Sequence, residues 1–315
     1  MRALLITSNR LGDAVLTTGA VPYLLGRYPG LRLTVACGAL PAPLFEAMPG
    51  VSEVWRIQKK SYSRHWWGLW KKAAPHFWQH VVDLRGSAFA FTVLTRRRSI
   101  LPPDHSMQHR VMHLTQTLHA THPTAPVLHW RPEHAAEADR LLSGGERWIA
   151  IGPTANWRGK QWQSERFGQV ARALTATDGL CSNAHILVAG APGEEQMAAP
   201  VLAALPSDRV VAAFGWPLPV LAAALSKMDL YIGNDSGLMH MAAAVGAPTV
   251  GLFGPSRPEH YAPWGSKATI VRTKTTFDEF IARPGYNRFT TGSLMEEITP
   301  EAVLAAAQSL LETTT

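Results

Sequence analysis

The stretch DLYIGNDSGLMHMAAAVGAPTVGLFG, residues 229–254, predicts two buried strands joined by a short helix. A strand, a polar turn, a small-residue helix and a second strand follow one another at residues 230–232, 234–237, 238–245 and 249–253. Gly246 is a helix-ending residue, and Pro248 stands just beyond it. Such a unit places the helix N-terminus at the carboxyl end of a sheet, where free N–H groups and the helix dipole favour an anion.

The residues of the turn suit that role. Asp235 or Ser236 can cap the helix, and Gly237 lets a ligand approach the backbone. His240 lies within the first turn and a half, so it can face the same space. A diphosphate is therefore the expected ligand of this turn.

Strands and helices alternate along the rest of the chain, which favours βαβ units and parallel sheets. In the first half we expect strands at 3–7, 31–36, 51–57 and 81–84, with helices at 14–28 and from 87. The pattern restarts near Gly144, with strands at 148–152, 185–190 and near 210, and helices at 167–176, 194–205 and 219–227. Two doubly wound, Rossmann-like α/β domains over 1–145 and 146–315 are the simplest arrangement, with a cleft between them. A closing helix at 300–312 could pack back on the first domain.

Composition bounds the class of protein. The chain has 315 residues, 46% hydrophobic and 17% charged, which is ordinary for a globular protein. Its apolar runs are too short to span a bilayer, and Arg10 and Asp13 interrupt any signal-like N-terminal run. Cys37 and Cys181 are far apart, which suits a reducing cytoplasm. No Asp-x-Asp occurs, which argues against a nucleotide diphosphate held by a metal ion. We expect no metal and no cofactor.

Four residues that follow strands are candidates for chemistry, and each has a plainer structural interpretation. Asp13 is either a first-turn helix acid or a general base for a sugar hydroxyl. Lys160 is a solvated loop lysine or a phosphate ligand. Glu194 is a helix-start acid or a ribose ligand. Trp216 is a core aromatic or a stacking partner for a base.

The net charge of +7 is uneven, because residues 1–145 carry 17 Lys and Arg against 8 Asp and Glu. Residues 55–78 hold five of the eleven tryptophans among six Lys and Arg. This mixture is typical of a surface that meets a membrane or an anionic glycolipid. An ordinary solvated basic face is equally compatible with it, and no nucleic-acid motif supports a nucleic-acid partner. The candidate acceptor contacts in and near this stretch are Lys59, Lys60, Arg64 and Arg85.

Taken together, these segments resemble glycosyltransferase family 9, the heptosyltransferases of lipopolysaccharide core assembly. The segments over 233–248 and 11–18 are similar to the family's two main motifs. The loop at 160–162, the turns at 190–194 and 254–256, and the segment at 295–300 follow in the family's order.

The resemblance implies the GT-B architecture, with the acceptor on the first domain and the nucleotide sugar on the second. It implies an inverting, metal-independent transfer of a heptose from an ADP-sugar to an anionic, lipid-linked saccharide at the cytoplasmic face of the bacterial inner membrane. Asp13 would be the base and Lys160 would assist departure of the diphosphate. The donor contacts implied are Thr154, Lys160, Glu194 (ribose), Trp216 (adenine), Asp235, Ser236, Gly237 and His240.

Two other classes of function remain open at this point. A GT-B-like nucleotide-sugar epimerase or hydrolase would need further acid and base carboxylates in the cleft. A non-catalytic protein that binds glycolipids or membranes through its basic half would need no nucleotide pocket.

Overall fold

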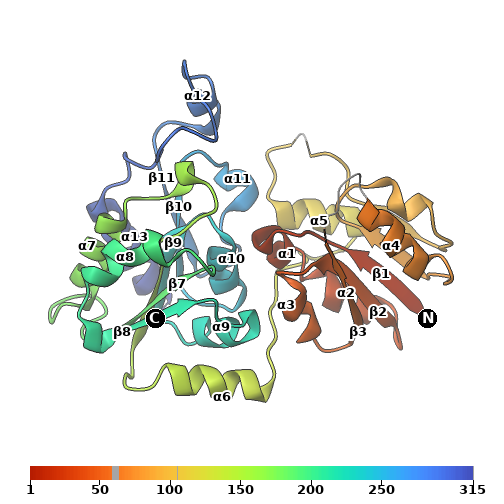
Figure 1. Ribbon diagram of the computed structural model, residues 1–315, viewed down its shortest axis with the longest axis horizontal. Coiled ribbons are helices and arrows are strands. Elements are labelled where there is room, and N and C mark those ends of the chain that lie inside the picture. Colours follow the sequence, from red (N-terminus) through yellow and green to blue (C-terminus); the bar gives the residue numbers. More distant parts are fainter. Residues whose placement is uncertain (59–63, 105, 315) are drawn as a thin grey trace. The chain divides into compact units, whose positions relative to one another are not determined.

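The computed structural model describes residues 1–58, 64–104 and 106–314, without the side chain of Arg64. The chain divides into two compact units, Met1–Arg131 and Pro132–Thr315 (Figure 1). Helix α6 (Pro132–Leu141) belongs to the second unit, because it packs against α9 (Leu218–Leu225). The sequence-based division after residue 145 assigned this helix to the first half.

A five-stranded, wholly parallel sheet forms the centre of the first unit. Its order is β3-β2-β1-β4-β5, so the chain passes from β3 at one edge back to β4 beside β1, and the strand order reverses between β1 and β4. Ile6, at the end of β1, pairs with Ala36 on one side and Asp83 on the other. The strands are β1 (Arg2–Ile6), β2 (Arg32–Gly38), β3 (Val51–Ile57), β4 (His80–Asp83) and β5 (Arg98–Ile100).

Both faces of this sheet are covered, which is why its strands are nearly continuous apolar runs. Ala3 and Leu5 point into one core with α2 and α3, whereas Leu4 and Ile6 point into the other, with α4. The helices are α1 (Leu11–Leu16), α2 (Ala20–Arg27), α3 (Ala42–Glu46), α4 (Arg64–Ala73), the 3₁₀ turn η2 (Ala88–Phe91) and α5 (Arg110–Leu118).

The single helix expected over 14–28 is in fact two, α1 and α2. Thr17 and Thr18 donate their hydroxyls to the carbonyls of Ala14 and Val15, at 2.8 Å each. Such local bonds compete with helix continuation. Likewise, the helix expected from residue 87 is only the short turn η2, which Ser87 caps at its start and which ends at Thr92, whose hydroxyl donates to the carbonyl of Phe89.

The second unit contains a six-stranded parallel sheet in the order β11-β10-β9-β6-β7-β8. Its first strand, β6, lies beside β9, so the order reverses between them, as in a dinucleotide-binding fold. The strands are β6 (Trp148–Gly152), β7 (His185–Gly190), β8 (Val210–Phe214), β9 (Leu230–Asn234), β10 (Thr249–Phe253) and β11 (Ala268–Arg272).

Helices also cover both faces of this second sheet. Phe167 of α7, Val201 of α8 and Val303 of α13 lie in one core with β6 and β9, so the closing helix is part of the second unit's core. Helix α10 packs on β9, β10 and α9 on the other face. The remaining bounds are η3 (Arg158–Lys160), α7 (Ser164–Thr175), α8 (Glu195–Ala203), η4 (Ser207–Arg209), α10 (Gly237–Ala244), α11 (Pro258–Tyr261), α12 (Phe277–Ile281) and α13 (Pro300–Thr314). Among the helices described, none has the length and apolar content needed to cross a bilayer.

Candidate functional site

The switch between β6 and β9 is where a doubly wound sheet binds its ligand, outside the carboxyl ends of the strands. The loop after β6 carries Lys160, and the turn after β9 carries Asp235 and leads into α10. Two segments that the sequence singled out separately are therefore neighbours in the fold. Their proximity follows from the parallel pairing of Ile151 with Ile232 and of Gly152 with Gly233.

Lys160, Asp235 and His240 form one charged cluster at this switch. The Lys160 ammonium donates to Asp235 Oδ2, and His240 Nε2 lies 3.9 Å from Asp235 Oδ1. The side chains of Asp235 and His240 are almost fully buried, whereas Lys160 keeps 22% of its side chain exposed. The lysine is therefore the member of the cluster that solvent or an entering anion can reach.

Asn234, at the end of β9, links the turn after β9 to the loop after β6 through hydrogen bonds of its side chain. Its Oδ1 accepts from the backbone N–H of Trp162 at 3.1 Å, and its Nδ2 donates to the carbonyl of Pro153 at 2.8 Å. The Trp162 indole donates in turn to the carbonyl of Ile298 at 3.0 Å. Asn234 is completely buried, so these bonds satisfy an amide that would otherwise be costly to enclose.

Helix α10, which follows the turn, places the positive end of its dipole beside this cluster. Ser236 is the N-cap of α10 with extended backbone, and its side chain makes no capping bond to the described helix. The first N–H groups of a helix have no partner within the helix, so those of Gly237 and its successors can bind an anion.

A buried tyrosine supports the floor of the site. Tyr231 lies between two glycines at the strand ends, since a Cβ on Gly152 would lie 2.0 Å, and one on Gly233 2.4 Å, from its hydroxyl. Burial raises the pKa of Tyr231 well above its usual range, so the phenol stays neutral. Glycine is required at both places because the ring occupies the space of a side chain.

The three remaining donor candidates follow β6, β7 and β8, which are adjacent strands. Thr154 is buried beside the end of β7, where a Cβ on Gly190 would lie 3.3 Å from its Oγ1. Glu194, half-buried, accepts from the backbone N–H of Ala191 at 2.9 Å and so turns back onto its own loop. Trp216 is half-buried between β8 and α9.

Asp13 lies in the first unit, in the first turn of α1 after the carboxyl end of β1. It is half-buried, and Ser8 donates to its Oδ2 at a long 3.4 Å. A carboxylate held this loosely keeps lone pairs available for another donor.

Comparisons with known proteins decide the family. The model of glycosyltransferase family 9 (heptosyltransferase) matches residues 72–280. The chain belongs to glycosyltransferase family 9. It is therefore a glycosyltransferase, and the resemblance drawn from its motifs is confirmed.

Relatives of this family 9 glycosyltransferase match over nearly its whole length. Lipopolysaccharide heptosyltransferase 2 of Salmonella typhimurium is 24% identical over 99% of both chains. A family 9 glycosyltransferase of Veillonella parvula has a TM-score of 0.82 at 22% identity, over 99% of this chain and 97% of that one. The structure of E. coli ADP-heptose lps heptosyltransferase II has a TM-score of 0.77 at 20% identity, over 100% of this chain and 99% of that one. The two Rossmann-like sheets are thus those of the GT-B-like fold.

The acceptor candidates of this glycosyltransferase have different surroundings. Arg85 follows β4 and lies with its guanidinium carbon 4.9 Å from the centre of the Trp66 ring. Its Nη1 is buried and has no hydrogen-bond partner among the described residues. Arg64 begins α4, but its side chain is outside the described part, as are Lys59 and Lys60 entirely.

Two buried polar residues of this glycosyltransferase were missed by the sequence reasoning as site residues. Asn234 was seen only as part of a turn. Asp83, at the end of β4, accepts from the N–H of Arg85 at 3.0 Å and from the Ser87 hydroxyl, and so shapes the Arg85 loop. Burial raises the pKa of Asp83 above its ordinary value. The available signal was a polar residue placed directly at the end of a buried strand.

The described part of the chain contains no group of side chains suited to hold a metal ion. No group of three or more His, Cys, Asp and Glu side chains is arranged there to hold an ion.

Proposed function

We propose that this glycosyltransferase moves a heptose from ADP-heptose to an anionic, lipid-linked core saccharide of lipopolysaccharide. The observation that carries the proposal is the cluster of Lys160, Asp235 and His240 beside the N-terminus of α10. A lysine and free helix N–H groups at a sheet switch point are a seat for a diphosphate. The names of its relatives, heptosyltransferases that use ADP-heptose or act on lipopolysaccharide, supply the sugar and the acceptor.

The proposed reaction is an inverting displacement. The acceptor hydroxyl oxygen bonds to the anomeric carbon while the bond from that carbon to the diphosphate oxygen breaks. The hydroxyl proton passes to the Asp13 carboxylate, and ADP leaves. Charge grows on the diphosphate as the bond breaks, so Lys160 and the α10 N–H groups stabilise the transition state more than the ground state. These groups take the place of a metal ion in the proposal.

The other site residues have proposed roles in the same scheme. Thr154, Ser236 and Gly237 contact the diphosphate or the sugar, Glu194 the ribose and Trp216 the adenine. This assignment is supported by the order of β6, β7 and β8, which would lay an extended nucleotide along their carboxyl ends. Glu194 would exchange its bond to Ala191 for the ribose hydroxyls.

The proposed acceptor partners are cationic side chains of the first unit. Arg85 has a buried Nη1 to offer to a phosphate or carboxylate of the acceptor, and Lys59, Lys60 and Arg64 are its proposed companions. The lipid-linked acceptor implies peripheral contact with a membrane, at the cytoplasmic face of the bacterial inner membrane.

The experiment compares transfer by wild type, Asp13→Asn and the exposed control Glu53→Gln, with ADP-heptose and a purified acceptor. Loss of a general base predicts a kcat lower by about 10²–10⁴ for Asp13→Asn, with ADP-heptose affinity unchanged. NMR of the product should show an inverted anomeric centre, and EDTA should leave the rate unchanged. Full activity of Asp13→Asn would remove Asp13 from the mechanism. If a different nucleotide sugar stabilised the protein more than ADP-heptose in thermal-shift assays, the assignment of ADP-heptose as the donor would be wrong.

A further inference from the structure

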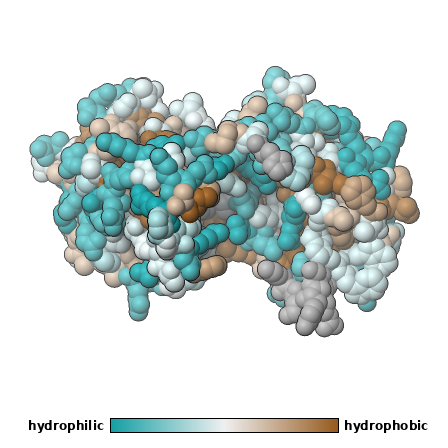
Figure 2. All heavy atoms as spheres, turned by 90° about the horizontal axis from the view of Figure 1, so that it is seen from above, coloured by the Kyte–Doolittle hydropathy of each residue, from teal (hydrophilic) through white to brown (hydrophobic). Residues whose placement is uncertain are grey.

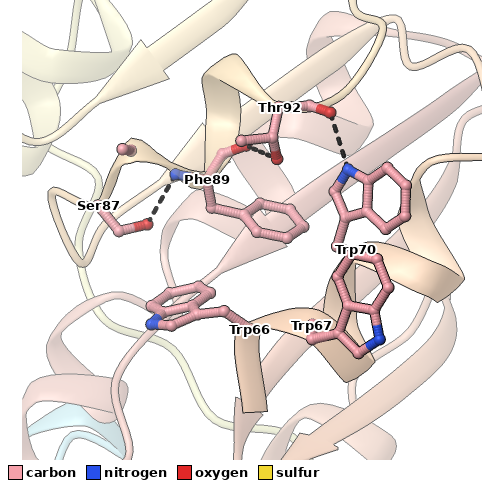
Figure 3. A pocket seen from close by; sticks show the side chains of 7 residues that line it. Trp66, Trp67, Trp70, Ser87, Phe89 and Thr92 are labelled. Carbon is pink, nitrogen blue, oxygen red and sulfur yellow. Dashed lines mark hydrogen bonds between the residues drawn. The ribbon is translucent and has the colours of Figure 1, made fainter. Parts of the chain in front are cut away.

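An aromatic groove lies on the first unit, beside Arg85, whose guanidinium carbon is 4.9 Å from the ring centre of Trp66 in the groove lining. It has a volume of about 460 Å³, within the range of ligand sites, and it opens between α4 and η2 (Figure 3). The rings of Trp66 and Phe89 stand 5.6 Å apart on one side, and those of Trp67 and Trp70 stack at 4.9 Å on the other. Its lining is Trp66, Trp67, Trp70, Ser87, Ala88, Phe89 and Thr92.

The two side-chain hydroxyls of this lining and the Trp70 indole are already engaged within the protein. Ser87 donates its hydroxyl to Asp83, and Thr92 donates its hydroxyl to the carbonyl of Phe89 at 2.8 Å. The Trp70 indole donates to the carbonyl of Thr92 at 3.1 Å. A sugar would need such groups for its hydroxyls, so the groove suits a hydrocarbon better than a saccharide.

Large apolar side chains are exposed in the groove lining and next to it in the chain, since Phe91 and Leu94 flank the lining residue Thr92. Trp67 is 58% exposed, Phe91 70% and Leu94 69%. Figure 2 shows apolar side chains gathered on the surface of the first unit, at the right of the view. Several large apolar side chains exposed on the segments that line one groove are typical of a contact surface.

Positive charge surrounds these apolar side chains. The Lys71 ammonium lies 5.4 Å from the Trp67 ring centre, and the Arg98 guanidinium carbon 6.0 Å from that of Phe91. Residues 64–98 contain seven Lys and Arg and one acid, Asp83, which is buried. A partner for this face must therefore be apolar and anionic together.

We propose that this groove, together with the exposed side chains of Trp67, Phe91 and Leu94, docks the protein on an anionic phospholipid bilayer and takes up an acyl chain. Tryptophan favours the interface of a bilayer, while lysine and arginine meet its phosphates. The proposal rests on the membrane contact proposed above and identifies the surface and chemistry that make it.

Sedimentation with vesicles tests the surface without donor or acceptor. The full-length protein should bind phosphatidylcholine vesicles containing about one third phosphatidylglycerol, and bind pure phosphatidylcholine weakly. Phe91→Ser with Leu94→Ser should weaken binding about tenfold or more, because exposed apolar groups lose their burial in lipid. Lys71→Glu with Lys72→Glu should weaken it at least as much and make it less sensitive to salt.

Matched controls come from the second unit. Ile281→Ser with Phe289→Ser removes two exposed apolar side chains, and Lys267→Glu with Lys274→Glu reverses two exposed charges. Both should bind vesicles as wild type does. Thermal unfolding of every variant separates a loss of binding from a loss of folding.

Lipids brominated along the acyl chain test entry into the groove. They should quench wild-type tryptophan fluorescence, and less so after Trp66→Phe with Trp67→Phe. Binding without quenching, or equal binding by the Phe91 and Leu94 variant, would show that the groove is not the site of lipid contact, while leaving the proposed membrane contact itself intact. Failure of wild type to bind any anionic vesicle would overturn both. Transfer to a soluble, delipidated acceptor, measured in parallel, reports on the proposed activity separately.

Discussion

The Lys160 ammonium and the Asp235 carboxylate form an ion pair between residues 75 positions apart in the sequence. The pair joins the loop after β6 to the turn after β9, across the point where the strand order reverses. It holds the lysine beside the first turn of α10, to which His240 also belongs. The ion pair thereby positions a flexible side chain in advance, which would lower the entropy cost of binding the proposed diphosphate.

Removal of the lysine should impair both binding and departure of the diphosphate. We expect Lys160→Ala to lower kcat/KM for sugar transfer about 10²–10³-fold, in line with the loss of one preorganised donor. Asp235→Asn should have a smaller effect, chiefly on donor affinity, because it frees the lysine without removing it. Steady-state kinetics and donor titration measure the two effects. The exposed Lys267→Ala serves as the control, and a Lys160→Ala rate within twofold of wild type would contradict the assignment.

Loss of the Asn234 amide should separate the two loops and destabilise the second unit. Asn234→Ala leaves the N–H of Trp162 and the carbonyl of Pro153 buried without partners, which costs about 2–4 kcal/mol of unfolding free energy. Urea denaturation followed by Trp fluorescence measures this, with donor affinity as a second readout. Asn156→Ala, at an exposed position of the same loop, should be nearly neutral. Equal stability of the two variants would show that Asn234 does not tie the loops together.

The close packing of Tyr231 against Gly152 and Gly233 can be tested with a double-mutant cycle that measures unfolding free energy. Gly152→Ala places a Cβ 2.0 Å from the tyrosine hydroxyl and should cost about 1–3 kcal/mol of stability. Tyr231→Phe removes that hydroxyl, so the double variant should be more stable than the sum of the single changes predicts. Gly26→Ala in α2, where a Cβ would meet nothing within 4 Å, should be neutral or stabilising. Additive effects at Gly152 and Tyr231 would contradict the contact.

A buried histidine should make the first unit sensitive to acid. Burial, with smaller contributions from Arg97 and Arg27, lowers the pKa of His80 from 6.5 to about 4. The folded state therefore favours the neutral ring, and the stability this contributes is complete above pH 6.5 and is lost as the pH falls towards 4. The gap between the two pKa values corresponds to roughly 3 kcal/mol.

His80→Gln removes this titration and can retain the contact to Ser99, which His80 Nε2 makes at 3.0 Å. The unfolding free energy from urea curves at pH 7 and pH 4.5 should fall further in wild type than in His80→Gln. Since other titrating groups are common to both proteins, the difference between them isolates His80. An identical loss in the two proteins would exclude it as the source.

Much of the fold follows from local sequence. Apolar runs such as 148–152 and 230–232 form strands that are buried on both faces of a sheet. The alternation of such runs with helices predicts two parallel sheets. The break between α1 and α2 did not follow, because it depends on how Thr17 and Thr18 bond back to the preceding turn. The aromatic stretch around Trp66 and Trp67 showed its composition but not that its rings would line a groove.

The sequence by itself determined the family, the two Rossmann-like sheets and the identity of the motif residues, because strand periodicity and turn residues act within a few positions of one another. The tertiary structure alone decided which of these residues meet. Parallel register brought Lys160 to Asp235 and let Asn234 bond to Pro153 and Trp162 of the loop after β6. Such contacts depend on which strands become neighbours, and that order results from the packing of the whole sheet rather than from any single segment.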